Sequence, residues 1–312
     1  MIAAFVVMVL HSAAQVFDVI VIGGGPAGLS AALMLGRCRR RVLVCDVGEP
    51  RNRRSRALHG YLTRDGIEPR ALNDLGRREL ATYGVEFRCV GVAAAEREQT
   101  HFRLSLANGA EERARYLLIA TGVVDDLPAI PGFEDCYGRS IFHCPYCDGW
   151  EWRDRRIAAL GRGRDVTALA LGLKTWSRDI VVCTHGTALD GGGRKRLARN
   201  GIDVRNERIA AIDHRDGELS RIVFEEGDAI DREALFFSTA QHPQSSIAAA
   251  LGCTLTRRGV VKTGSLCDTN VERVFVAGDA SRDAQFVVVA AAEGVKAAVA
   301  INRALQAEEL AR

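Results

Sequence analysis

A glycine-rich turn between an apolar strand and a helix constrains this chain more than any other feature. The segment Phe17–Ile22 is apolar apart from one aspartate, and the run Gly23-Gly24-Gly25-Pro26-Ala27-Gly28 follows it directly. A Gly-x-Gly-x-x-Gly turn in this context is typical of a dinucleotide-binding βαβ unit. Gly23 permits the tight turn, Gly25 lets the backbone approach a pyrophosphate, and Gly28 allows close helix–strand packing.

The same plan recurs in the middle of the chain, which suggests an internal duplication. Residues 156–160 form an apolar strand, Gly161-Arg162-Gly163 a turn, and the following residues to about Lys174 a helix. Another apolar strand comes next, at residues 180–184. Strands that alternate with helices predict parallel, doubly wound sheets. We therefore expect an α/β protein.

Proline and glycine place two breaks in the chain. One lies at residues 127–132 and the other at His242-Pro243. They predict an inserted domain at 127–241 and a discontinuous domain made of 1–126 and 242–312, with residues 1–16 as an extension. We expect the domains to rotate about these breaks. The run Gly191-Gly192-Gly193 reads as a flexible loop tip.

Composition narrows the partners and the compartment. Of 312 residues, 47% are apolar and 26% charged, with a formal net charge of +3, which does not favour nucleic acid. Nine cysteines, mostly far apart, do not resemble a secreted disulfide framework, so we expect a reducing compartment, the cytoplasm. The apolar run at residues 2–10 is too short to span a bilayer and has no basic residue before it. We expect no membrane association.

Further motifs extend the dinucleotide prediction to FAD. Asp46 ends the second strand, where a carboxylate can accept hydrogen bonds from a ribose. Thr121-Gly122 and Gly278-Asp279 each follow an apolar strand, and Asp279 suits a ribityl hydroxyl. Gln285 is predicted to open a helix, with Phe286 beside it, whose positive end would face the flavin pyrimidine ring.

The only closely spaced cysteines are the chemical centre of the sequence. In Cys144-Pro145-Tyr146-Cys147-Asp148, two intervening residues let a helix start bring both sulfurs within bonding range and lower a thiol pKa. Asp148 is placed to relay protons. His143 is either a thiolate partner or a structural residue. Zinc binding would need more ligands than His143 and Cys136 supply, so we expect no metal; inert core cysteines are the other alternative.

Together these motifs resemble the low-molecular-weight thioredoxin reductases. The resemblance runs from about Phe17 to Leu305 and rests on four motifs in order: the glycine turn, the Ala120-Thr121-Gly122 turn, the dithiol and Gly278-Asp279. It implies two Rossmann-like three-layer ββα domains, FAD on the discontinuous one and a homodimer. It also implies that Cys147 exchanges electrons with the flavin and Cys144 attacks the substrate disulfide, with Asp148 as the acid.

The middle domain departs from this pattern where NADPH would bind. Gly161 and Gly163 are present, but Val166 takes the third glycine position, and Arg164 stands where small residues usually leave room for a pyrophosphate. The family's NADPH users carry a His-Arg-Arg run after the next strand, and this chain has Thr184-His185-Gly186. Three possibilities therefore stay open. The donor is NADPH, or it is ferredoxin or another non-nicotinamide donor, or electrons flow in the reverse direction, from a dithiol through the flavin to oxygen.

Three functional hypotheses follow. The favoured one is a reductase that passes electrons from a donor through FAD to Cys144–Cys147 and on to thioredoxin or a similar disulfide. The second is a flavin-dependent oxidase of a small dithiol. The third is a non-catalytic, FAD-binding redox sensor in which the dithiol stays far from the flavin.

Overall fold

The structure is a computed structural model that describes residues 16–238, 240–281 and 284–311. The chain divides into two compact units. The first combines the chain up to Pro50 with Asn73–Val123 and Pro243–Arg312, and the second combines Arg51–Leu72 with Val124–His242. The apolar run at residues 2–10 lies outside the described residues. No described helix is both long enough and apolar enough to cross a membrane.

The first unit is built on a mixed sheet. Its parallel strands are β1 (Phe17–Ile22), β2 (Val42–Cys45), β3 (Glu86–Arg88), β6 (Glu111–Ile119) and β17 (Val274–Val276). Two antiparallel strands, β4 (Val92–Arg97) and β5 (Phe102–Leu106), extend it, in the order β3-β2-β1-β6-β5-β4. The sequence indicated β1, β2, β6 and β17, but neither β3 nor this antiparallel extension.

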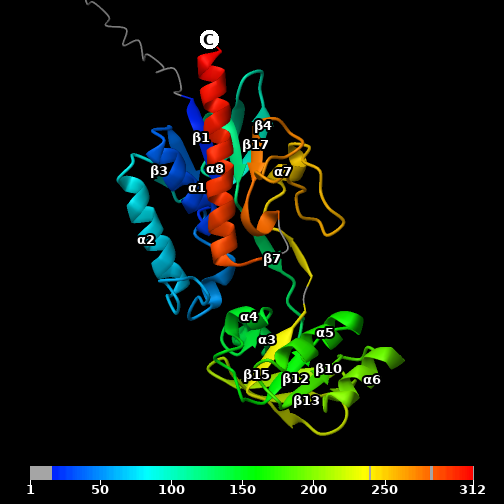
Figure 1. The fold of residues 1–312 in the computed structure, drawn as a ribbon. Coiled ribbons are helices and arrows are strands. Elements are labelled where there is room, and N and C mark those ends of the chain that lie inside the picture. Colours follow the sequence, from blue (N-terminus) through cyan, green and yellow to red (C-terminus); the bar gives the residue numbers. More distant parts are fainter. Residues whose placement is uncertain (1–15, 239, 282–283, 312) are drawn as a thin grey trace, which may run out of the picture. The chain divides into compact units, whose positions relative to one another are not determined.

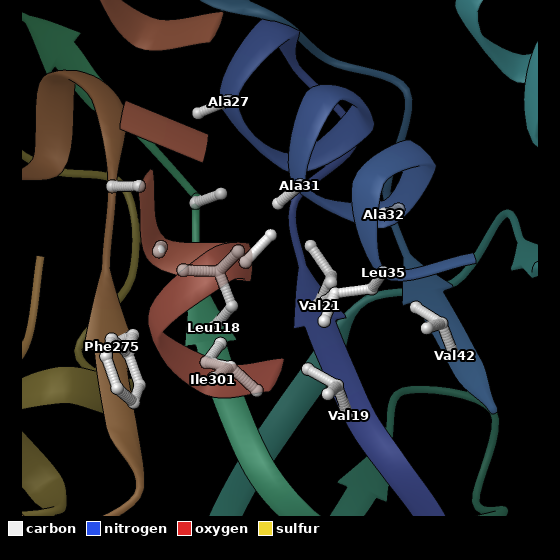
Figure 2. Close-up of a cluster of buried hydrophobic side chains, with 14 of the residues drawn as sticks. Val19, Val21, Ala27, Ala31, Ala32, Leu35, Val42, Leu118, Phe275 and Ile301 are labelled. Atoms are coloured by element: carbon white, nitrogen blue, oxygen red, sulfur yellow. The ribbon is translucent and has the colours of Figure 1, made fainter. Parts of the chain in front are cut away.

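Two long helices cover the apolar side chains of this sheet. Helix α1 (Pro26–Arg37) and the C-terminal helix α8 (Val287–Leu310) run close together (Figure 1). Buried side chains from β1, α1, β6 and α8 meet in one cluster, of which Val21, Leu35, Leu118 and Ile301 are members (Figure 2). This core fixes the glycine turn, because the turn joins β1 to α1.

Before residue 124 and after residue 242, the remaining helices and turns are short, except for one helix. Helix α2 (Pro69–Ala81) crosses the unit boundary at Leu72, and α7 (Ile247–Ala250) is a single turn. Two 3-10 turns, η1 (Arg51–Arg54) and η2 (Gly278–Ala280), complete them.

The second unit repeats the parallel plan of the first. Its strands β8 (Ile141–Phe142), β9 (Ile157–Leu160), β10 (Ile180–Cys183), β11 (Asp203–Arg205) and β15 (Ala234–Phe237) form one parallel sheet. Its order, β11-β10-β9-β15-β8, matches β3-β2-β1-β6-β17 of the first unit. An antiparallel sheet comprises β12 (Ile209–Arg215), β13 (Glu218–Phe224) and β14 (Ile230–Asp231). The matching orders agree with an internal duplication.

Four short helices accompany these sheets. They are α3 (Phe133–Cys136), α4 (Pro145–Asp148), α5 (Gly163–Leu173) and α6 (Gly191–Arg199). The prediction of a flexible loop at Gly191-Gly192-Gly193 is wrong, because these residues form the first turn of α6. The Asp190 carboxylate accepts a hydrogen bond from the Gly193 N–H and caps that turn.

The two breaks differ in detail from their prediction. His242-Pro243 lies in a short strand, β16 (Gln241–Pro243), which pairs with β7 (Val123–Asp125). Residues 127–132 have no regular structure, but Ile130 is buried and the Ile212 N–H donates to the Pro131 carbonyl. This segment is packed into the second unit, and the chain passes between units after Pro50, Leu72, Val123 and His242 instead.

Candidate functional site

The glycine turn after β1 has the geometry that each glycine was predicted to need. Gly23 adopts a φ of +107°, and a Cβ there would lie 2.4 Å from the Ala120 carbonyl oxygen. A Cβ on Gly28 would lie 1.9 Å from the Gly23 carbonyl oxygen. Larger residues are therefore excluded at both positions, and the turn packs directly against the residue before Thr121-Gly122.

The start of α1 is shaped to receive an anion. A Cβ built on Gly25 meets nothing within 4 Å, so the backbone faces open space there. Gly25 is the N-cap and Pro26 the first helical residue, and no side chain caps the helix. The first N–H groups of a helix have no intrahelical partner, so those of Ala27 and Gly28 suit the phosphates of a dinucleotide. These residues fit the diphosphate of FAD.

Asp46 lies against the same turn. Its carboxylate accepts hydrogen bonds from the Gly24 N–H at 2.9 Å and the Gly48 N–H at 3.1 Å. Arg77 of α2 forms an ion pair with it at 3.0 Å and stacks over Phe87. The sequence did not point to Arg77, because it lies 31 residues from Asp46 within a polar helix.

The two later FAD motifs come to the same region of the first unit. Gly122 has a φ of +72° and its carbonyl accepts from the Gln244 N–H. A Cβ on Gly278 would lie 3.0 Å from the Ala27 Cβ, so the Gly278-Asp279 turn meets the start of α1. The buried carboxylate of Glu293 on α8 accepts the Gly278 N–H at 2.9 Å. Sequence reasoning missed Glu293, which orients this turn.

Gln285 and Phe286 stand just before α8 rather than inside it. The helix begins at Val287, two residues later than predicted, and Phe286 is its extended N-cap residue. A Cβ on Gly294 would lie 2.0 Å from the Ala27 carbonyl oxygen. The N-terminal third of α8 is thereby held against the beginning of α1.

The predicted dithiol is present as a disulfide. Cys144 and Cys147 are bonded, with their Cα atoms 5.3 Å apart. Cys144 is the N-cap of α4, and its sulfur accepts a hydrogen bond from the Cys147 N–H at 3.2 Å. Because α4 is a single turn, its dipole is much smaller than that of a full helix. The Cys147 N–H, more than the helix expected from sequence, is therefore placed to stabilise a thiolate on Cys144 after reduction.

Asp148 has the acidity of a proton carrier. Burial, and to a lesser extent the negative charge of Glu151, raises its pKa to about 7. His59 approaches the Glu151 carboxylate at 3.5 Å and Asp65 at 3.6 Å. An aspartate with a pKa near 7 can hold and release a proton at neutral pH.

Aromatic side chains surround the dithiol turn. A Cβ on Gly149 would lie 2.7 Å from the indole ring of Trp176, so only glycine fits there. Trp176 packs edge-on against Tyr146, which lies between the two cysteines and is 78% exposed. Trp150 is also largely exposed, and the Arg153 guanidinium stacks on it. The disulfide thus lies among exposed apolar rings.

The second glycine turn shares the open helix start of the first, since a Cβ on Gly163 meets nothing within 4 Å and no side chain caps α5, but it differs at the third glycine position. Val166 is fully buried in the core of the second unit, and a Cβ on Gly161 would lie 3.1 Å from the Val166 Cβ. Gly163 has a φ of +54° and begins α5, while Arg164 is exposed on its first turn. The Nδ1 of His185 accepts the Ile209 N–H at 2.9 Å. That ring nitrogen is therefore engaged with the backbone.

The region of the turn still carries positive charge. Arg194, Lys195 and Arg196 are exposed on α6.

Nowhere in the described part of the chain do three His, Cys, Asp or Glu side chains come close enough to hold a metal ion.

Comparison with known proteins places this geometry in a family. The family model for pyridine nucleotide-disulphide oxidoreductases matches residues 17–294. A protein of Arthroderma benhamiae named "Probable thioredoxin reductase" is 31% identical, over 94% of this chain and 81% of its own length. Thioredoxin reductase sirT of Leptosphaeria maculans is also 31% identical, over 92% and 94% of the two chains.

Solved structures agree with the sequence comparisons. The crystal structure of HlmI superimposes with a TM-score of 0.92 at 35% identity, covering 95% of this chain and 94% of that one. An oxidoreductase from Agrobacterium tumefaciens gives a TM-score of 0.88 at 32% identity, covering 94% and 99%. The chain therefore belongs to the pyridine nucleotide-disulphide oxidoreductase family and is an FAD-dependent enzyme of the low-molecular-weight thioredoxin reductase type.

Proposed function

We propose that Cys144 and Cys147 are the working dithiol of this enzyme and that they reduce a disulfide of thioredoxin or a similar protein. The observation that carries this proposal is the Cys144–Cys147 disulfide beside a carboxyl group, Asp148, whose pKa is raised by burial to about 7. FAD, when bound, supplies two-electron redox chemistry. In this proposal Cys147 exchanges electrons with the flavin, Cys144 attacks the substrate disulfide, and Asp148 accepts and releases the proton.

The proposed cofactor site combines the residues of the first unit described above. The turn from Gly23 to Gly28 holds the diphosphate, and Asp46 binds the adenosine ribose. The ribityl chain and flavin are assigned to Thr121, Gly122, Gly278, Asp279, Gln285 and Phe286. The uncapped start of α1 and the open space at Gly25 support this assignment.

The second unit favours an electron donor other than NADPH. The Nδ1 of His185 accepts a hydrogen bond from the backbone, and Val166 fills the position where a small residue would let the helix pack closely on the strand. A ferredoxin-like donor would need neither a free His185 side chain nor a small residue at position 166. Anaerobic mixing tests this: NADPH should bleach the flavin absorbance slowly or not at all, and bleaching within seconds would restore NADPH as the donor.

A second function, oxidation of a small apolar dithiol with oxygen as the acceptor, is favoured by one observation. Tyr146 and Trp150 expose apolar rings beside the disulfide, as a site for an apolar small molecule requires. Oxygen consumption on addition of dithiols, without reduction of thioredoxin, would select this function over the first.

Cysteine variants test the proposal itself. Cys147→Ser should abolish electron transfer to any disulfide while FAD stays bound, and Cys144→Ser should abolish turnover while leaving Cys147 to interact with the flavin. The matched control is Cys89→Ser, which removes an exposed free cysteine of the other unit. Full activity of Cys147→Ser would refute the dithiol role.

We further propose that the enzyme is a cytoplasmic homodimer. The seven cysteines outside the pair form no disulfide among the described residues, which suits a reducing compartment. Sedimentation of the holoprotein at twice the mass of the chain would support the dimer, and a monomer at micromolar concentration would refute it.

A further inference from the structure

A chain of hydrogen bonds inside the second unit ends at the residue before the dithiol. The Asp125 carboxylate forms a two-pronged ion pair with Arg51, at 2.5 and 2.7 Å, and both side chains are largely buried. It also accepts from the Gln241 amide at 3.0 Å and the Tyr137 hydroxyl at 2.7 Å. The Tyr137 oxygen then lies 3.2 Å from Nδ1 of His143.

These contacts determine where the proton of His143 lies. Burial by itself would raise the pKa of Asp125, but the hydrogen bond from Arg51 and nearby positive charge bring that pKa below its usual value. An ionised carboxylate only accepts, so the Tyr137 hydroxyl donates its one proton to Asp125. Tyr137 can then only accept from His143, whose proton must be on Nδ1. The neutral ring therefore presents a bare lone pair on Nε2.

The other ring nitrogen is open to a proton donor. No hydrogen bond to Nε2 occurs within the described residues, and this atom is not among their buried, unpartnered polar atoms. Burial, followed by the charge of Arg51, lowers the pKa of His143 to about 4, and Asp125 opposes this effect. That value belongs to the disulfide form. A thiolate beside the ring would raise it, because an opposite charge favours the imidazolium.

We propose that Nε2 of His143 accepts the proton of the Cys144 thiol in the reduced enzyme, and that Asp125, Tyr137 and Arg51 are the positioning residues that fix its tautomer. This inference rests on the proposed dithiol function and goes beyond it. It assigns Cys144 a proton acceptor distinct from Asp148, which remains with Cys147.

The complete exchange balances. The proton of Cys144 passes to His143, and the thiolate attacks one sulfur of the substrate disulfide, whose S–S bond breaks as a mixed disulfide forms. Cys147, having given its proton to Asp148, attacks the Cys144 sulfur and releases the second substrate thiolate. The protons on His143 and Asp148 go to the two substrate thiolates. The enzyme dithiol is oxidised to a disulfide and the substrate disulfide is reduced to a dithiol.

Thiol acidity tests the proposal without turnover. The FAD-loaded protein is reduced with dithiothreitol, freed of reductant anaerobically and alkylated with iodoacetamide between pH 5 and 9, with the labelled cysteine assigned by mass spectrometry. We expect His143→Gln to move the Cys144 profile toward the ordinary thiol pKa of about 8.5 and to slow alkylation at pH 6.5 about tenfold. Tyr137→Phe should slow it about threefold, because the tautomer is no longer fixed.

The matched control is His242→Gln, which removes an exposed histidine bonded to Asp126 in the same unit. It should leave the profile unchanged. A His143→Gln profile that coincides with the wild type would overturn the proposal. If that variant does not fold, Tyr137→Phe, which loses only one oxygen, decides in the same way. Failure of the dithiol function is seen separately, as full turnover by Cys144→Ser.

Discussion

The raised pKa of Asp148 makes a prediction about stability that can be measured without substrate. The pKa is 3.8 for an ordinary aspartate here and about 7 in the folded protein. Between these values the unfolded chain has lost the proton and the folded chain still holds it, so stability must fall as pH rises. Above pH 7 the buried carboxylate is ionised, and the full destabilisation is about 4 kcal/mol as an upper bound.

The variant Asp148→Asn removes this dependence because an amide does not ionise. Its stability relative to the wild type should be about 3 kcal/mol more favourable at pH 8 than at pH 5. The assay is urea unfolding of the oxidised, FAD-loaded protein at both pH values, followed by tryptophan fluorescence. Asp203→Asn, at an exposed position on β11, is the control and should show no such change. Equal pH dependence in the wild type and Asp148→Asn would refute the burial argument.

Two further predictions concern the first unit. Gly294→Ala places a Cβ 2.0 Å from the Ala27 carbonyl oxygen and should destabilise the protein by about 1–3 kcal/mol in thermal unfolding. Gly172→Ala, in an open helical position, should be neutral or stabilising, and the reverse order would contradict the packing. Asp46→Ala loses acceptors for two backbone N–H groups, each worth about 1 kcal/mol, and should weaken FAD binding by at most about thirtyfold in equilibrium titration. Asp46→Asn, which retains one acceptor oxygen, should weaken FAD binding less, and an equal loss in both variants would contradict this role.

Local patterns carried much of the fold. A buried strand, a glycine turn and a helix are specified by neighbouring residues, so β1, α1 and their counterparts β9 and α5 could be predicted from spacing alone. The dithiol is equally local, because two intervening residues bring the sulfurs together. The error at the glycines of α6 came from a local signal that was missed, because Asp190 directly precedes them and caps the first turn of the helix.

The sequence by itself thus determined the family, the cofactor and the pair of cysteines, because each motif behind these predictions consists of residues close together in the chain. Only the tertiary structure decided which distant side chains complete the sites. Arg77 reaches Asp46 across 31 residues, and Glu293 reaches Gly278 from a separate helix. The path from Asp125 through Tyr137 to His143 likewise joins separate elements. Such pairings leave no periodic trace in a single sequence, because they depend on how whole sheets and helices pack.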